Sequence, residues 1–180
     1  MLLKRSLIAA VLLLDGVFVA AVSSPQAAEI RHLTPPSALV EHARLLDRLN
    51  ALADRPGQLG AEGKQLLEAM RTHLRYREEV VLPAFTLLPQ LAEGSATPDM
   101  AWAVALGERV RRERPQHLQA RLDITDHLIA VFAAAQAAGD EAAAQEAQDL
   151  AAFMLGDAEV DENVTLAVGD WLRRQVQEGG

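Results

Sequence analysis

The sequence predicts an all-α protein, an antiparallel up-and-down four-helix bundle preceded by an export signal. Three observations carry this prediction. The 180 residues are rich in Ala and Leu, with 50% hydrophobic and only 4% aromatic residues and few β-branched runs, a composition that favours helices. Helix-start and turn signals divide the chain after residue 30 into four long segments. Apolar residues recur within these segments at helical spacing.

Residues 1–28 are predicted to be a signal peptide, and residues 29–180 the folded bundle. Lys4 and Arg5 precede the apolar stretch LIAAVLLLDGVFVAAV, and the small-residue run SSPQAA follows it. This order is typical of an export signal, so we expect a periplasmic or secreted protein. Asp15 interrupts the apolar stretch and leaves it short for a membrane span. We therefore expect no integral membrane span in the mature chain; an uncleaved anchor is the alternative.

The four helices follow from the turn signals of the chain. They are expected at residues 34–53, 60–81, 97–138 and 141–174. The Pro- and Gly-rich stretch DRPGQLGAEG separates the first two helices, and the short apolar piece AFTLLPQLAEG caps the bundle before the third. Pro115 should kink the third helix because it lacks a backbone donor. Asp140 is the expected N-cap of the last helix, and the short turns make neighbouring helices antiparallel.

The composition excludes several classes of function. The absence of cysteine excludes disulfides, thiolate metal sites, iron–sulfur clusters, cysteine nucleophiles and c-type haem attachment. With 17 Lys and Arg against 25 Asp and Glu, the formal charge is −8, which argues against a nucleic-acid partner. The sequence offers no Gly-rich phosphate loop and no Ser–His–Asp arrangement, so we expect no enzymatic activity. The remaining chemistry is that of histidine, carboxylates and arginine.

Helical geometry directs ionisable side chains at the core. His42 lies within the apolar stripe of the first helix. His73 and Arg77, one turn apart, lie on the apolar face of the second. Arg121 and Asp157 lie centrally on the apolar faces of the third and fourth. Because buried charges need partners, we expect these groups to meet at the bundle centre.

Four stretches of the chain resemble the bacterial hemerythrin-like, or HHE cation-binding, domain: TPPSALVEHARLLDRLNAL, HLRYREEVVLPAFTLLPQLAEG, RERPQHLQARLDI and VTLAVGDWLRR. The resemblance implies a bundle in which each of two helix pairs supplies one His, then a second His with a Glu four residues later. Together these side chains hold a di-iron centre in the family. Such spacing places both ligands on one helical face, and imidazole and carboxylate suit iron.

The ligand positions of the family match this chain only in part. The six positions fall on His42, His73, Arg77, Arg121, Phe153 and Asp157. This alignment equates the two halves, with Arg77 of the first opposite Asp157 of the second. Arginine stays protonated, and at an effective dielectric constant near 20 two like charges about 4 Å apart repel by about 4 kcal/mol. We therefore predict a core charge pair in which Arg77, together with Arg121, faces Asp157. The di-iron site is then degenerate, and no cofactor is expected.

The predicted function is a non-enzymatic binding or interaction module with a protein or small-ligand partner. The alternative is a protein that binds non-haem iron (mono- or dinuclear), another cation or oxygen at a metal site with fewer ligands than the family's. That site consists of His42, His73 and Asp157, with His117 as a replacement ligand one turn before Arg121. A b-type haem held by a histidine and Met70 or Met154 is a third interpretation. Glu78 and Glu79 are expected to be solvated.

Overall fold

The structure, a computed structural model, describes residues 33–178, with the side chains of 155–159 and 176–178 outside that description. These residues form helices and turns, and no strand occurs among them. The predicted all-α class is therefore confirmed for this part of the chain. The predicted signal peptide, residues 1–28, lies outside the described residues. No helix within residues 33–178 combines the length and apolarity needed to cross a bilayer.

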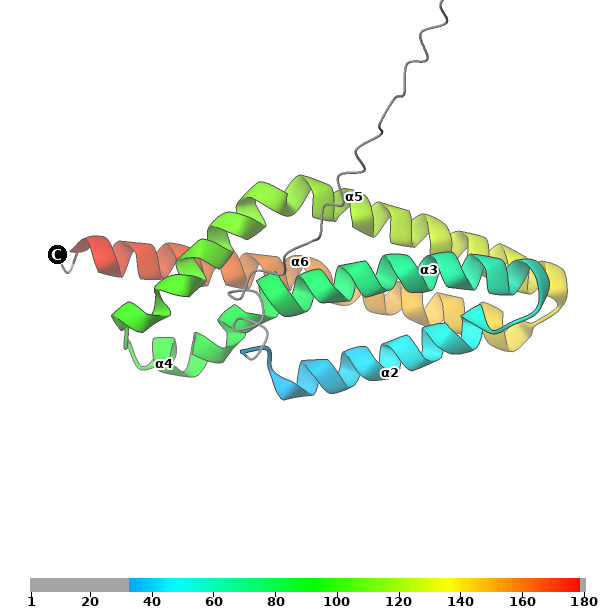
Figure 1. Cartoon of the computed structure of the whole chain (residues 1–180), viewed down its shortest axis with the longest axis horizontal. Helices are drawn as coiled ribbons and strands as arrows, with labels where there is room; N and C mark the ends of the chain where they lie inside the picture. Colours follow the sequence, from blue (N-terminus) through cyan, green and yellow to red (C-terminus); the bar gives the residue numbers. More distant parts are fainter. Residues whose placement is uncertain (1–32, 179–180) are drawn as a thin grey trace, which may run out of the picture.

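Long helices dominate the described part of the chain. They are α2 (Pro36–Ala53), α3 (Gly57–Tyr76), α5 (Ala101–Ala138) and α6 (Glu141–Glu178). All four extend along the long dimension of the molecule (Figure 1). The most extensive contacts join α5 to α6, followed by those of α3 with α5 and of α2 with α3. Four short pieces connect α3 to α5: η1 (Arg77–Val81), η2 (Leu82–Leu87), α4 (Leu88–Ala92) and η3 (Pro98–Met100).

The turn between α2 and α3 is shorter than predicted. α3 begins at Gly57, whose φ of +68° suits glycine, so Gly60 and Gly63 lie inside the helix. Both have a packing reason to lack a side chain. A Cβ on Gly60 would lie 1.8 Å from the Arg55 carbonyl oxygen, and one on Gly63 would lie 2.7 Å from the Leu52 carbonyl carbon. These glycines allow the start of α3 to pack directly against the end of α2.

The turn between α5 and α6 follows the prediction. The Ala143 backbone N–H donates to Asp140 Oδ1 at 3.0 Å, so Asp140 is the N-cap of α6. Gly139, with a φ of +67°, ends α5 in the left-handed conformation. α5 remains helical through Pro115 and bends in its middle (Figure 1), as proline inside a helix dictates.

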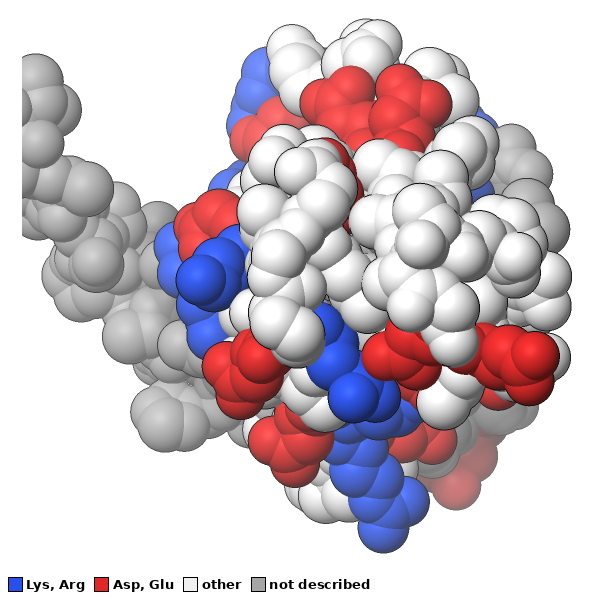
Figure 2. Space-filling model, turned by 90° about the vertical axis from the view of Figure 1, so that its right-hand side faces the viewer, with Lys and Arg blue, Asp and Glu red and all other residues white. Residues whose placement is uncertain are grey.

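Ion pairs cover the end of the molecule where these two turns lie. Figure 2 views this end and shows acidic and basic side chains interleaved around uncharged surface. Arg48 Nε lies 2.6 Å from Glu146 Oε1, and Arg55 Nε lies 3.5 Å from Asp140 Oδ2. Both arginines are exposed, so each pair contributes at most about 1 kcal/mol to stability.

Three apolar clusters fill the interior of the described part of the chain, and the smallest consists of Val80, Val81 and Val110. The largest cluster includes Leu49, Leu66 and Ile124 and lies toward the α2–α3 and α5–α6 turns. A smaller cluster, which includes Ala103 and Leu172, lies toward α4. The side chains that interrupt these apolar runs are buried and ionisable. They form the candidate site.

Candidate functional site

The regular α-helix of α3 gives way at Tyr76 to a π-helical turn, Arg77–Val81. In a π-helix the hydrogen bonds join residues five apart instead of four, so one extra residue fits on each turn. As a result both Arg77 and Glu78 are buried, with exposed fractions of 7% and 8%. The prediction of a solvated Glu78 is wrong, because it assumed a constant α-helical pitch through this segment.

Two threonines satisfy carbonyl groups of this π-helical turn. Thr34 Oγ1 donates to the Glu78 carbonyl oxygen at 2.6 Å, and Thr165 Oγ1 of α6 donates to that of Val81 at 2.7 Å. Buried carbonyl groups cost free energy unless they accept a hydrogen bond, so these contacts stabilise the irregular turn. The N-cap position of α2 is Pro35, without a side-chain cap, so the hydroxyl of Thr34 serves the π-helical turn instead of the helix start.

Two buried histidines each bond a buried glutamate of another helical segment. His42 Nδ1 of α2 lies 2.9 Å from Glu78 Oε1. His117 of α5 bonds through Nδ1 to Glu162 Oε1 of α6. None of the four side chains is more than 10% exposed. Each half of the chain therefore contributes one His–Glu pair to the core.

His73 extends the second pair into a chain of three groups. Its Nδ1 lies 3.0 Å from His117 Nε2, and the two rings are within 5° of parallel. On His117 the ring of Tyr76 also packs, with centroids 4.1 Å apart. His73 Nε2 is buried and has no hydrogen-bond partner among the described residues. Burial, with help from the nearby charge of Arg77, lowers the pKa of His73 to about 3, so this imidazole is neutral at neutral pH.

Arg77 forms an ion pair with Asp161 of α6, one helical turn beyond the expected Asp157. Their side chains are 8% and 18% exposed. The side chain of Asp157 lies outside those that the structure describes, and so does the expected contact between it and Arg77. The charge of Arg77 is thus balanced inside the core by a carboxylate from the other half of the chain.

Arg121 does not occupy the central position that the sequence predicts for it. Its side chain is partly exposed. α5 instead turns His117, Ile124 and Leu128 inward, and Leu118 is 55% exposed. His117 therefore takes the inward place assigned to Arg121, because the apolar face of α5 is rotated relative to the predicted one.

The two halves of the chain align one helical turn away from the predicted register. Arg77 and Asp161 are separated by 84 residues, as are Val81 and Thr165. The same offset equates Glu78 with Glu162, both missed by the sequence argument. A signal for them exists, since the stretches REEVVL and DENVTL share Glu, Val and Leu at matching places. A shift of one turn preserves the helical face, so hydrophobic periodicity alone does not reveal it.

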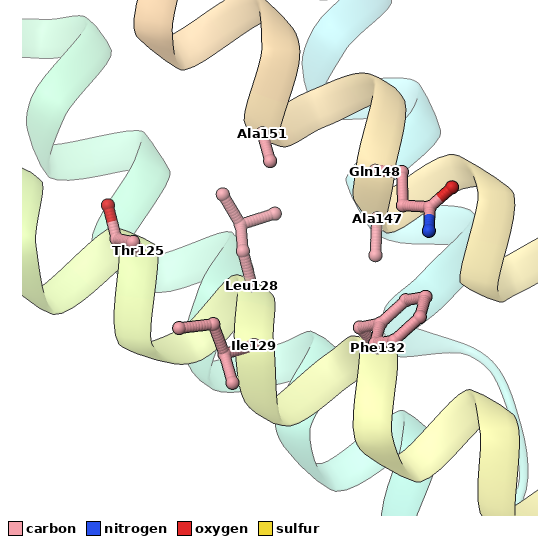
Figure 3. A pocket seen from close by; sticks show the side chains of 7 residues that line it. All are labelled: Thr125, Leu128, Ile129, Phe132, Ala147, Gln148 and Ala151. Atoms are coloured by element: carbon pink, nitrogen blue, oxygen red, sulfur yellow. The ribbon is translucent and has the colours of Figure 1, made fainter.

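The surface hollow of Figure 3 is a separate, apolar feature. Leu128, Ile129 and Phe132 of α5 face Ala147 and Ala151 of α6 around a volume of about 170 Å³. None of the described residues that line it is charged. The ionisable groups described above belong to the interior of the molecule and not to this hollow.

Comparison of the chain with known protein families, with curated proteins and with solved structures finds no match. Among the residues that the structure describes, no group of three His, Asp or Glu side chains is already arranged to hold a metal ion. The interpretation of the core therefore rests on its own contacts, burial and charges.

Proposed function

We propose that this chain is a hemerythrin-like, antiparallel four-helix bundle that binds one divalent transition-metal ion in its core and has no enzymatic activity. The proposed ligands are His42, His73 and Glu78. This is the smaller ligand set considered from the sequence, with Glu78 in place of Asp157 as the carboxylate. The proposed ligands come from α2, α3 and η1, and helical bundles build metal sites from side chains on facing helices.

One observation carries the proposal: His73 is a neutral imidazole whose buried Nε2 has no hydrogen-bond partner among the side chains that the structure describes. Buried polar atoms without partners are rare in folded proteins, and an unassigned ion is one explanation for them. Metal ions bind the neutral form of imidazole, which is the form that burial favours here. Iron, manganese and zinc all accept a mixture of imidazole and carboxylate ligands.

The charge of the core also favours a cation. Arg77 and Asp161 neutralise each other, which leaves the carboxylates of Glu78 and Glu162 among histidines. Arg114 Nε lies 3.8 Å from Glu162 Oε2, but its side chain is exposed, so solvent screens its charge. A divalent ion would add positive charge next to these two buried carboxylates. For this ion to bind, Glu78 has to exchange its hydrogen bond with His42 for a metal contact.

A second candidate is a bundle without metal that acts as an interaction module. It is favoured by the direct pairing of the core groups with one another, His42 with Glu78 and Arg77 with Asp161. In that case the polar core serves to fix the packing of the helices. Its partner would be a protein or small ligand that binds elsewhere on the molecule.

Metal titration separates the two candidates. Protein prepared with chelator and then freed of it is titrated with Zn²⁺ and, without oxygen, with Fe²⁺, and binding is followed by calorimetry. We expect one equivalent to bind, and His73→Gln and His42→Gln to weaken binding by at least about tenfold. His127→Gln is the matched control, because His127 lies on α5, partly exposed, outside these contacts. Absence of stoichiometric binding to the wild-type protein would refute the metal site and leave the second candidate.

We further propose that the bundle is exported, on the basis of the charged, apolar and small-residue order of residues 1–28. Expression of the full chain in a bacterium, followed by cell fractionation and determination of the mature N-terminus, tests this proposal. A mature protein that starts near residue 29 in the periplasmic fraction would support it. Full-length protein in the cytoplasm would contradict it.

A further inference from the structure

We infer that Glu162 and His117 form a hydrogen-bonded relay that fixes the proton of His73 on Nδ1 and reserves its Nε2 lone pair for a ligand. The inference assigns Glu162 and His117 as positioning residues and not as ligands. It deepens the proposed function and rests on it for the identity of the ligand, a metal ion. The proton positions themselves are a property of the metal-free protein.

The relay begins at the carboxylate. Carboxylate oxygens only accept hydrogen bonds, and Glu162 Oε1 contacts His117 Nδ1. His117 Nδ1 must therefore carry a proton. In a neutral imidazole only one ring nitrogen is protonated, so His117 Nε2 holds a lone pair and acts as an acceptor.

The second step transfers this preference to His73. His117 Nε2 lies 3.0 Å from His73 Nδ1, within hydrogen-bond distance, and the two rings are stacked within 5° of parallel. Because His117 Nε2 accepts, His73 Nδ1 donates. His73 Nε2 is left with its lone pair, and it is one of the buried side-chain atoms without a hydrogen-bond partner in the described part of the chain.

The opposite proton arrangement is less favourable. It requires a protonated His117 that donates from both nitrogens, so that His73 accepts at Nδ1 and carries its proton on Nε2. That arrangement buries an N–H donor that has no partner among the described residues, which costs free energy. It also places a second desolvated cation near Arg77, whose charge already acts on His73.

The surroundings of His117 hold the relay in place. The ring of Tyr76 packs on that of His117 at 4.1 Å, and the His117 and Glu162 side chains are at most 6% exposed. Histidines that bind metals commonly donate their other ring N–H to a carboxylate, which fixes the tautomer and raises the basicity of the ligand nitrogen.

The tautomers can be measured directly by long-range ¹H–¹⁵N NMR of the histidine side chains in metal-free protein at neutral pH. We expect neutral Nδ1–H tautomers for both His117 and His73. Glu162→Gln should remove the fixed preference and give His73 a mixture of tautomers, whereas Glu146→Gln, on the same helix but outside the core, should change neither ring. An Nε2–H tautomer of His73 or an imidazolium at His117 in the wild-type protein would overturn the relay.

The wild-type spectrum decides the question even if Glu162→Gln fails to fold. The relay and the proposed function can fail separately: absence of Zn²⁺ binding would refute the metal site while the Nδ1–H tautomer of His73 stood. If Zn²⁺ binds, the relay predicts that Glu162→Gln lowers the affinity by about 10- to 100-fold and leaves one equivalent bound. An unchanged affinity would contradict the positioning role of Glu162.

Discussion

Replacement of Arg77 by methionine should destabilise the protein by about 3 kcal/mol. The Arg77 side chain is 8% exposed, and its partner Asp161 is 18% exposed. Loss of one partner of a buried ion pair costs about 3–5 kcal/mol, because the remaining charge stays desolvated. Partial access of water to Asp161 puts the value at the low end of this range. Methionine preserves the apolar stem of the side chain, so the effect reports the lost charge.

The free energy of unfolding is measured by urea denaturation followed by far-ultraviolet circular dichroism. A loss of about 3 kcal/mol corresponds to a fall in Tm of roughly 6–12 °C for a domain of this size. Arg112→Met is the control, since Arg112 on α5 is 69% exposed and its replacement should change stability by less than about 0.5 kcal/mol. The double variant with Asp161→Leu should be less destabilised than the sum of the single changes, because the two residues are in contact. If Arg77→Met costs less than about 1 kcal/mol, Arg77 behaves like a surface residue and the buried pair is refuted.

Three further predictions use the same unfolding measurement. The pKa of His73 in the folded protein, about 3, lies below its ordinary value of 6.5. The contribution of His73 to stability should therefore be complete above about pH 6.5 and fall by up to about 1.4 kcal/mol per pH unit as the pH decreases toward 3. The variant His73→Gln should reduce this slope. Thr165→Val should cost about 1 kcal/mol through the lost hydroxyl contacts, and Thr125→Val, at an exposed site, close to nothing. Gly63→Ala should cost about 1–3 kcal/mol of stability, because its Cβ would lie 2.7 Å from backbone. Gly107→Ala, with a nearest contact of 3.4 Å, should be close to neutral. Equal effects of the two substitutions would contradict the packing argument.

Local rules were sufficient for the helical class and for the α5–α6 turn. Asp140 and Gly139 act through contacts within a few residues, which sequence rules describe well. The same rules misplaced the start of α3. They treat Gly60 and Gly63 as turn residues. These glycines instead pack closely against the end of α2, and no local rule describes such a tertiary contact.

The site was predictable only for residues that precede the π-helical turn. His42 and His73 lie on regular α-helices, so a rotation of 100° per residue places them correctly in the core. Glu78 lies within the π-helical turn, where that rotation no longer holds. Glu162 was missed for a different reason, because an alignment of the halves that is wrong by one turn still satisfies the hydrophobic pattern. Contacts between the halves, such as that of Thr165 with Val81, define the register.

The Arg77–Asp161 pair explains why the proposed site takes one ion instead of two. The two residues occupy equivalent positions of the two halves, 84 residues apart, and their side chains meet. Two carboxylates at such facing positions would repel each other by about 4 kcal/mol at 4 Å and an effective dielectric constant near 20, unless a cation lay between them. Arginine on one side converts this repulsion into attraction, so no second cation is needed there to balance charge. Titration should therefore saturate at one equivalent of metal, and two equivalents in the wild-type protein would contradict this account of the core.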